Sequence, residues 1–276
     1  MQNQNTPAAN VYAPPQDYDY LWTQLRDVPY FRGLLRAVES RFYRDLPMRG
    51  PVLDLGSGDG LFARQTFAKK LDAGIDPFYS PTYGGITGEA YLSMEIAEGA
   101  EMPFKSETFN TVISNSVLEH IPDLEPVIAE VYRVLNPGGY FLFCSPSDRF
   151  TDWMIGGKFF GDAYRNWFNK IARHHHTDSP AVWTERLNRH GLEVERIWYY
   201  FSPKATQTLE LGHYFGLPNL ITRKLFGKWV MWPSRSNPFL RFLDATLRPI
   251  YNEPLPAVGS MVFCVARKPA KICLGG

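Results

Sequence analysis

Cysteine is scarce in this sequence of 276 residues, and its three cysteines are not arranged as pairs. Cys144, Cys264 and Cys273 are an odd number, and no two of them have a Cys-x-x-Cys spacing. A disulfide framework needs paired cysteines, and a structural zinc site usually needs closely spaced ones. Neither feature is therefore predicted, and a reducing cytoplasm is the expected location.

The sequence also lacks an excess of charge and a long apolar run. Its 29 Lys and Arg residues nearly balance 28 Asp and Glu residues, so the formal net charge is +1 and we predict no nucleic-acid partner. No apolar run approaches the roughly 18 to 20 residues that span a bilayer. The opening MQNQNTPAANVYAPPQ has neither the cationic start nor the apolar segment of a secretory signal. We expect a cytoplasmic protein that is soluble or peripheral at the membrane.

The residues that are present suit one α/β domain with an appendage. Apolar residues make up 45% of the chain and charged residues 21%, which is ordinary globular usage. Residues 1–16 are rich in Asn, Gln, Ala and Pro, and they predict a disordered tail. Residues 17–46 carry apolar side chains at helical spacing, which predicts an N-terminal helical cap.

Short apolar strands alternate with helical segments through residues 47–200. The first unit is PVLDLGSGDG followed by LFARQTFAKK, a strand, a Gly-rich turn and a helix. Such alternation predicts an α/β fold with a Rossmann-like seven-stranded, mostly parallel sheet and helices on both faces. Residues 201–257 form an aromatic-rich insertion or lid, 258–268 supply the last strand of the core, and 269–276 form a tail.

The first turn and the second strand carry the residues of a nucleotide site. Gly56, Gly58 and Gly60 lack a Cβ where the backbone bends and approaches a ligand, and the following helix offers N–H donors. Asp76 follows Asp54 by 22 residues, where a carboxylate accepts hydrogen bonds from both hydroxyls of a ribose. Nicotinamide and flavin enzymes use related geometry, so these residues alone do not identify the cofactor.

Five motifs in order resemble those of the class I S-adenosylmethionine-dependent methyltransferases, especially the small-molecule and lipid enzymes. They are VLDLGSGDG at 52–60, Asp76, AEGAEMPF at 97–104, SETFNTVISNSVLEHIPD at 106–123 and EVYRVLNPGGYFLF at 130–143. The resemblance covers residues 51–145 and implies S-adenosylmethionine as the cofactor. Two positions depart from the family pattern: Asn110 and Glu98 each replace the commoner Asp.

The resemblance also implies roles for individual residues. Glu98 would accept a hydrogen bond from the adenine amine, and Gly99 or Ala100 would donate a backbone N–H to the ring. Asp54 would organise the turn or reach the methionine ammonium. Ser114 and Asn115 would lie beside the methionyl and sulfonium group, although Asn115 also suits a turn. The full cofactor-binding set is Asp54, Gly56, Ser57, Gly58, Gly60, Asp76, Glu98, Gly99, Ala100, Ser114 and Asn115.

Methyl transfer from an activated donor needs mainly positioning, and a general base is helpful. His120 is the candidate base, because a neutral imidazole accepts a proton near pH 7; a capping or packing role is the alternative. Glu119 and His120 resemble part of a metal site of some family members, but Ser116 stands where a second acid is expected, so we predict no metal. The run His174 to His176 predicts a loop with one histidine reaching inward.

The acceptor must be recognised outside the shared core, in segments that are all rich in aromatic residues. They predict a hydrophobic small-molecule, lipid or glycan-intermediate acceptor, methylated on oxygen. Residues 218–233 combine apolar and cationic side chains, which suits either a helix at a membrane interface or packing against the domain. A NAD-dependent oxidoreductase and a non-catalytic scaffold of the same fold are the alternatives. The oligomeric state is not predicted.

Overall fold

The structure, a computed structural model, describes residues 10–78 and 88–271. Its strands are β1 (Val52–Leu55), β2 (Leu71–Asp76), β3 (Tyr91–Ile96), β4 (Phe109–Asn115), β5 (Leu135–Pro146), β6 (Glu193–Tyr200) and β7 (Met261–Arg267). Its helices are α1 (Tyr20–Asp27), α2 (Tyr30–Arg44), α3 (Leu61–Thr66), α5 (Glu125–Val134), α6 (Ile155–Ala172), α7 (Pro180–Arg189), α8 (Pro203–Phe215), α9 (Leu217–Phe226) and α10 (Pro238–Tyr251), with a short 3-10 turn η2 (Leu118–His120).

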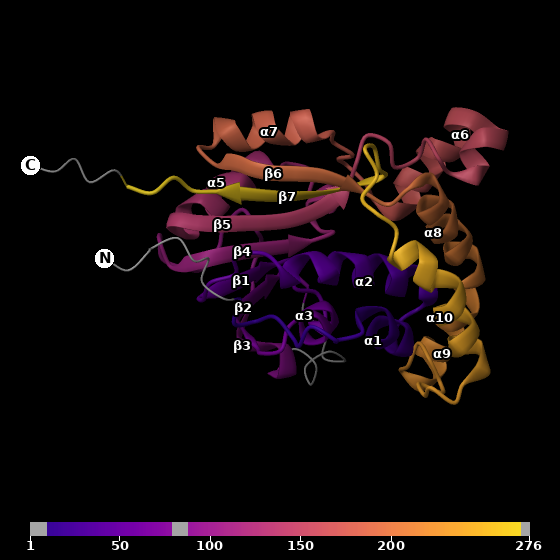
Figure 1. The fold of residues 1–276 in the computed structure, drawn as a ribbon. Coiled ribbons are helices and arrows are strands. Elements are labelled where there is room, and N and C mark those ends of the chain that lie inside the picture. The colour runs from indigo at the N-terminus through magenta and orange to yellow at the C-terminus, as the bar shows by residue number, and fades with distance from the viewer. Residues whose placement is uncertain (1–9, 79–87, 272–276) are drawn as a thin grey trace, which may run out of the picture.

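The strands form one sheet in the order β3-β2-β1-β4-β5-β7-β6 (Figure 1). The first five strands are parallel, and β7 runs antiparallel between β5 and β6. This confirms the predicted Rossmann-like, mostly parallel sheet of seven strands. The strand order reverses at β1, which lies between β2 and β4, and such a switch point opens a crevice at the carboxyl ends of the strands.

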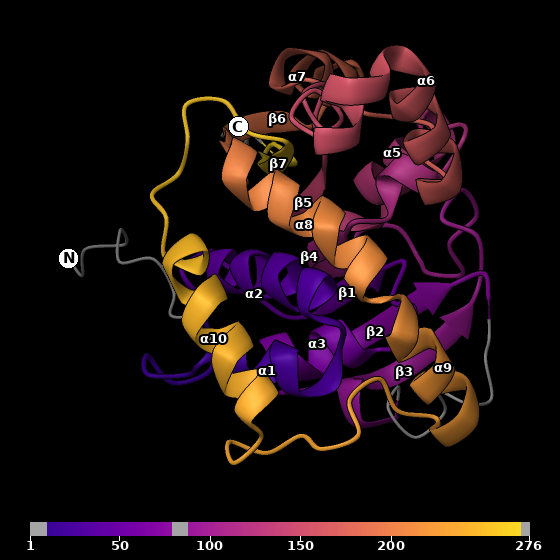
Figure 2. The ribbon, with the colours of Figure 1, turned by 90° about the vertical axis from the view of Figure 1, so that its right-hand side faces the viewer.

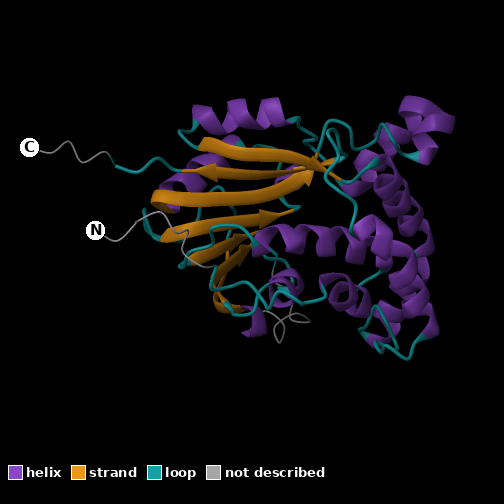
Figure 3. Cartoon of the chain, in the orientation of Figure 1, coloured by secondary structure: helices purple, strands orange, loops and turns teal. Residues whose placement is uncertain are grey.

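Helices cover both faces of the sheet (Figure 3). Val52 and Ile113 point to one face and pack in a core with side chains of α1, α2 and α3. Their neighbours Leu53 and Val112 point to the other face and pack with α5 and α7. The alternation follows from the two-residue period of a strand, and it explains why these strands are apolar at consecutive positions.

The amino-terminal helices and the late helices meet at the carboxyl end of the parallel strands (Figures 1 and 2). Helices α1 and α2 lie within residues 17–46, and α8, α9 and α10 lie within the predicted insertion at 201–257. Arg248 of α10 donates to both carboxylate oxygens of Asp19, the N-cap of α1, at 2.8 and 3.0 Å. This bidentate ion pair joins two segments that are far apart in the sequence.

The predicted disordered tail at 1–16 extends too far along the chain. Residues 1–9 lie outside the described part, but Asn10 and Tyr12 are packed against the domain. The Tyr12 ring is buried, and its hydroxyl donates to Asp72 Oδ2 at 2.8 Å. Asn10 donates to the Tyr43 carbonyl at 2.8 Å. Composition could not reveal these contacts, because a single anchoring ring does not change the polar character of the segment.

Within residues 10–78 and 88–271, no helix has both the length and the apolar content needed to cross a membrane.

Candidate active site

A cavity of about 370 Å³, lined by charged and polar side chains as well as apolar ones, lies at the carboxyl ends of β1, β2 and β4. Six of the residues predicted to bind the cofactor line it: Asp54, Gly56, Ser57, Gly58, Asp76 and Asn115. Further lining residues come from α1, α2, α9 and the segment after α9: Gln24, Arg32, Arg36, Arg223 and Trp229. The cavity, here called the donor cavity, therefore lies at the switch point where a nucleotide-containing ligand is expected.

The Gly-rich turn forms the floor of the donor cavity. Gly56, Gly58 and Gly60 have φ angles of +78°, +55° and +75°, which other residues rarely adopt. A Cβ on Gly56 would lie 2.4 Å from the Val117 side chain, whereas a Cβ on Gly58 would meet nothing within 4 Å. The first glycine is required by packing, and the second leaves open space over the backbone that a ligand can use.

Asp76 stands at the end of β2 with both carboxylate oxygens engaged by backbone. Its Oδ2 accepts from Gly58 N at 3.0 Å, and its Oδ1 accepts from Phe78 N at 2.9 Å. The first bond joins the end of β2 to the Gly-rich turn. A carboxylate oxygen has more than one lone pair, so this acid still has capacity for the hydroxyls of a ribose.

Asp54 is buried at the back of the donor cavity. Burial is the main cause that raises the pKa of its carboxyl to about 6, and the Tyr91 hydroxyl, which donates to Asp54 Oδ2 at 2.7 Å, partly offsets it. The side chain is therefore mostly ionised near neutral pH. It can attract a cationic group in the cavity, and it also fixes β3 to β1.

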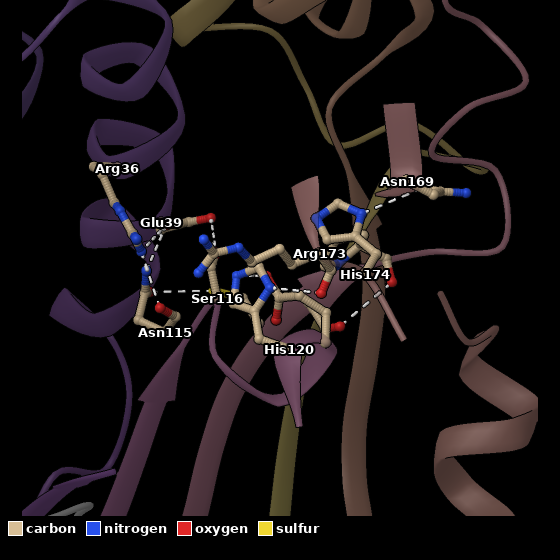
Figure 4. Close-up of polar contacts among 12 residues, drawn as sticks. Arg36, Glu39, Asn115, Ser116, His120, Asn169, Arg173 and His174 are labelled. Atoms are coloured by element: carbon tan, nitrogen blue, oxygen red, sulfur yellow. Dashed lines mark hydrogen bonds and ion pairs between the residues drawn. The ribbon is translucent and has the colours of Figure 1, made fainter. Parts of the chain in front are cut away.

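Arg36 and Glu39 of α2 form a buried network with the end of β4 (Figure 4). Arg36 donates to Glu39 Oε2 at 3.3 Å and to the Asn115 carbonyl at 3.0 Å. The Tyr200 hydroxyl donates to Glu39 Oε1 at 2.8 Å, and the Glu39 side chain is fully buried. This pair could not be predicted as part of the site from the sequence, because residues one helical turn apart also form ordinary solvated ion pairs.

Five predicted cofactor residues are not among the described residues that line the donor cavity. Ser114 is buried, and its hydroxyl donates to the Leu55 carbonyl at 3.0 Å. Gly60 lies at the N-cap of α3. The other three, Glu98, Gly99 and Ala100, follow β3; Glu98 is exposed, and a Cβ on Gly99 would meet Leu55 at 3.0 Å. The predicted adenine contacts at 98–100 therefore stay a prediction.

A second, mainly apolar cavity of about 420 Å³ adjoins the first and is here called the acceptor cavity. Its apolar wall comes from α2, α6, α8, α9 and nearby segments: Phe31, Leu35, Phe150, Phe168, Ala172, Leu209, Leu220 and Met261. Four residues line both cavities: Arg32, Arg36, Ser116 and Trp229. Two different ligands can therefore lie side by side across this shared wall.

Three histidines of the acceptor cavity are suited to the neutral state at pH 7. Burial lowers the pKa of His174 to about 4, and burial is also the main cause that lowers the pKa values of His120 and His213. His120 Nδ1 lies 3.1 Å from the Arg173 carbonyl (Figure 4). A carbonyl only accepts, so Nδ1 carries the proton and Nε2 of the neutral ring is left as an acceptor.

The segment His174 to His176 connects α6 and α7, and one of its histidines reaches inward as predicted. His174 lines the acceptor cavity. The backbone N–H of His175 donates to the Glu119 carbonyl at 2.7 Å, and His176 Nε2 lies 3.1 Å from the Pro122 carbonyl. These contacts fix the segment beside η2.

Glu119 is the acidic residue of the acceptor cavity. Its side chain is 2% exposed, and its Oε2 atom has no hydrogen-bond partner among the described residues. Burial raises the pKa of the carboxyl to about 8, so the group is mostly protonated at neutral pH. A buried neutral carboxyl with an unpartnered oxygen has capacity for one more hydrogen bond beside this cavity. Within the described ranges, no three or more His, Cys, Asp or Glu side chains are grouped to hold a metal ion.

A Rossmann-like sheet with one cavity at its switch point and a mainly apolar one beside it is typical of enzymes that bring a nucleotide-containing donor to a second substrate. A sequence model described as a methyltransferase domain matches residues 22–197, and the chain belongs to this family. The predicted membership of a methyltransferase family is thus confirmed, while the small-molecule or lipid type stays a prediction.

Individual relatives match over shorter stretches. An arsenite methyltransferase of Aquipseudomonas alcaligenes is 28% identical over 158 residues, 48% of this chain and 45% of the relative. An uncharacterized methyltransferase of Mycobacterium sp. strain JLS is 32% identical over 89 residues, 32% of this chain and 35% of the relative. The matches thus span about a third to a half of the curated relatives.

Solved structures share the fold across most of the chain. A methyltransferase of Thermotoga maritima, described as a possible histamine N-methyltransferase, has a TM-score of 0.51 at 18% identity, with 91% of this chain and 94% of that chain covered. A geranyl diphosphate C-methyltransferase of Streptomyces coelicolor has a TM-score of 0.50 at 14% identity, with 95% and 86% covered. These likenesses establish the fold.

Proposed function

We propose that the protein transfers a methyl group from S-adenosylmethionine to an oxygen atom of a hydrophobic small-molecule, lipid or glycan-intermediate acceptor. The observation that carries this proposal is the pair of adjoining cavities. One lies at the switch point and is lined by polar and apolar side chains in similar measure, the other is mainly apolar, and Arg32, Arg36, Ser116 and Trp229 line both. Such a pair suits a cofactor and an apolar substrate held with their reactive atoms in contact.

The donor cavity fits S-adenosylmethionine by the chemistry of its wall. Asp76 at the end of β2 would accept from the ribose hydroxyls, and the open space over Gly58 would admit the ligand to the turn. Asp54 or the amide of Asn115 would hold the methionine end. When bound, the cofactor supplies an activated methyl group. Family membership supports this choice over the NAD-dependent oxidoreductase.

The acceptor cavity supplies the apolar surface and a place for one proton. Phe31, Leu35 and Phe168 would pack against the apolar body of the acceptor. His120 Nε2 would take the hydroxyl proton of the acceptor when the acceptor oxygen receives the methyl group that the bound cofactor would supply. The Streptomyces coelicolor enzyme was solved with geranyl diphosphate, whose geranyl chain is apolar, and this supports an acceptor with an apolar part.

The same proposal includes the lid role of residues 201–257 and peripheral contact with a membrane through residues 218–233. Leu220 and Trp229 of this segment line the acceptor cavity, so the segment forms part of its wall. Packing of residues 218–233 against the domain is the alternative.

Labelled methyl transfer into a lipid extract tests the proposal. We expect the wild-type protein to add about 14 Da to a compound in the extract, the replacement of hydrogen by methyl. Ala172→Trp, which fills the acceptor cavity, should abolish this transfer and leave S-adenosylhomocysteine binding intact, whereas Asp76→Ala should weaken both. If calorimetry shows binding of NADH but not of S-adenosylhomocysteine, the oxidoreductase is correct. Cofactor binding without transfer into any extract supports the scaffold instead.

A further inference from the structure

Exposed apolar side chains gather on the helices at the carboxyl end of the sheet. They belong to α6, α8, α9, α10 and the segment between α9 and α10: Phe159, Phe160, Trp167, Ile171, Leu211, Tyr214, Phe215, Leu220, Ile221, Leu225, Phe226, Met231, Trp232, Phe239 and Phe242. Figure 2 shows these four helices on the side of the molecule that faces the viewer. A water-soluble monomer rarely keeps so many large apolar side chains on one side.

Helix α9 is the clearest case, because none of its described side chains is buried. Ile221, Leu225 and Phe226 are 62%, 67% and 59% exposed. Packing against the domain was the alternative explanation for this segment, and these exposures argue against it. A helix with an unburied apolar stripe gains stability only when another apolar medium covers it.

Positive charge accompanies the apolar side chains. No acidic residue occurs between Glu210 and Asp244, whereas the same stretch contains Arg223, Lys224, Lys228, Arg235 and Arg241. The whole chain has a net charge of only +1, so this concentration is local. Lys224, Lys228 and Arg241 are exposed. A face with both properties matches the interface of a bilayer that contains anionic lipids.

The other occupants fit less well. Nucleic acid would be bound by cations and stacking rings, but aliphatic side chains such as Ile221 and Leu225 neither stack on bases nor bond to phosphates. A second copy of the chain would bring the same positive stretch against itself, which is unfavourable.

The apolar face is continuous with the acceptor cavity. Leu220 of α9 is 52% exposed and also lines that cavity, and Trp229 stands on the wall shared with the donor cavity. Leu220 therefore connects the exposed apolar face of α9 to the acceptor cavity.

We propose that the face formed by α6, α8, α9, the 227–237 segment and the start of α10 docks on an anionic lipid bilayer, and that the acceptor enters its cavity from the bilayer beside α9. The docking does not depend on the proposed methyl transfer, while the entry route rests on it. The docking extends the contact of residues 218–233 to a whole face and assigns the charge of the lipid.

Vesicle sedimentation with the full chain, without methyl donor, tests the docking. We expect the protein to sediment with vesicles of phosphatidylcholine and phosphatidylglycerol and to stay in solution with phosphatidylcholine alone. Ile221→Asp/Leu225→Asp should abolish sedimentation. Lys224→Gln/Lys228→Gln should weaken it by roughly 25-fold, since each cation near an anionic surface contributes about fivefold. The matched control is Leu92→Asp/Ile96→Asp, two residues of β3 with 70% and 63% exposure, which should sediment like wild type.

Thermal unfolding and S-adenosylhomocysteine binding establish that each variant is folded. The docking proposal is wrong if the wild-type protein stays in solution with both vesicle types, or if it forms a dimer that the Ile221→Asp/Leu225→Asp variant loses. Equal binding to both vesicle types overturns the assigned lipid charge. Methyl transfer is measured separately. Docking without transfer refutes the proposed function alone. If a docking-deficient variant methylates a lipid-embedded acceptor as fast as the wild-type protein does, the entry route alone is refuted.

Discussion

The side-chain amide of Asn115 donates to Glu39 Oε2 at 2.7 Å, so the end of β4 is bonded to α2 of the N-terminal cap. The strand end belongs to the switch point of the sheet, and the helix supplies Arg36 to both cavities. The geometry of the residues that line both cavities therefore depends on the buried carboxylate of Glu39, which is not itself among the described residues that line either cavity.

Removing this carboxylate is expected to destabilise the whole domain. Glu39→Ala leaves Arg36 and the Asn115 amide without their buried partner, which costs about 3–5 kcal/mol in the free energy of unfolding. Glu39→Gln keeps an acceptor and should cost less. Urea unfolding measures both variants. Glu89→Ala, which breaks an exposed pair with Arg64, is the control and should change the free energy by under about 1 kcal/mol. Equal effects at the two positions would refute the structural role of Glu39.

The fold was predictable because its signals are local. Strand segments such as VLDL and TVISN are apolar at consecutive positions, and turns follow them, so the alternation of strands and helices could be read along the chain. The antiparallel placement of β7 between β5 and β6 could not be predicted, since the residue pattern of one strand does not encode its pairing partners.

The donor side of the site was more predictable than the acceptor side. Glycines and acids at the ends of β1 and β2 have a fixed relation to the sheet, so spacing alone predicted Gly58 and Asp76 as candidate site residues, and both line the donor cavity. Glu39 and Glu119 were not predicted in these roles, because each is buried by helices that come from distant parts of the chain. Burial is what distinguishes these two acids from solvated ones.

The two glycines of the turn should differ in their tolerance of alanine. Gly56→Ala adds left-handed backbone strain and a Cβ at 2.4 Å from Val117, whereas Gly58→Ala adds the strain alone. We expect about 1–2 kcal/mol of destabilisation for Gly58→Ala and clearly more for Gly56→Ala, measured by urea unfolding of the ligand-free protein. If the two variants lose the same free energy of unfolding, the close approach of Val117 to Gly56 is disproved.

Asp76 should contribute directly to cofactor affinity. Asp76→Ala removes a charged acceptor of the ribose hydroxyls and should weaken S-adenosylhomocysteine binding by about 1.5–3 kcal/mol, on the order of 10- to 100-fold. Asp76→Asn retains one acceptor oxygen for Gly58 N, so its affinity for S-adenosylhomocysteine should lie between those of the wild-type protein and Asp76→Ala. Calorimetric titration checks both, with Glu95→Ala, an exposed acid on β3, as the control. Unchanged affinity in the alanine variant would remove Asp76 from the site.

His120 should affect the rate of transfer and not cofactor binding. His120→Asn keeps an N–H donor for the Arg173 carbonyl but has no basic nitrogen, so we expect kcat to fall by roughly 10²- to 10⁴-fold with S-adenosylhomocysteine affinity unchanged. Because burial lowers the pKa of His120, the wild-type rate should already be level at pH 7. His175→Ala, an exposed neighbour of His174, is the control. A rate equal to that of wild type would leave His120 with a packing role.

Glu119 should make the stability of the protein depend on pH. Its carboxyl has an ordinary pKa near 4.5, and burial raises this pKa to about 8 in the folded state. Between these values the unfolded chain has lost the proton and the folded chain holds it, so stability falls as pH rises from about 4.5 to 8 and then levels off. Glu119→Gln cannot lose a proton. Its stability relative to wild type should therefore rise across this window, by at most about 1.4 kcal/mol for each pH unit.

Urea unfolding at pH 5, 6.5 and 8 measures this difference. Asp54 has a pKa of about 6 in both proteins and cancels in the comparison. Glu107→Gln is the control: a hydrogen bond from Lys271 lowers the pKa of Glu107, so its effect should be constant above pH 5. A pH-independent difference for Glu119→Gln would mean that this carboxyl is ionised in the folded protein, and the neutral hydrogen-bonding position in the acceptor cavity would then be an anionic one.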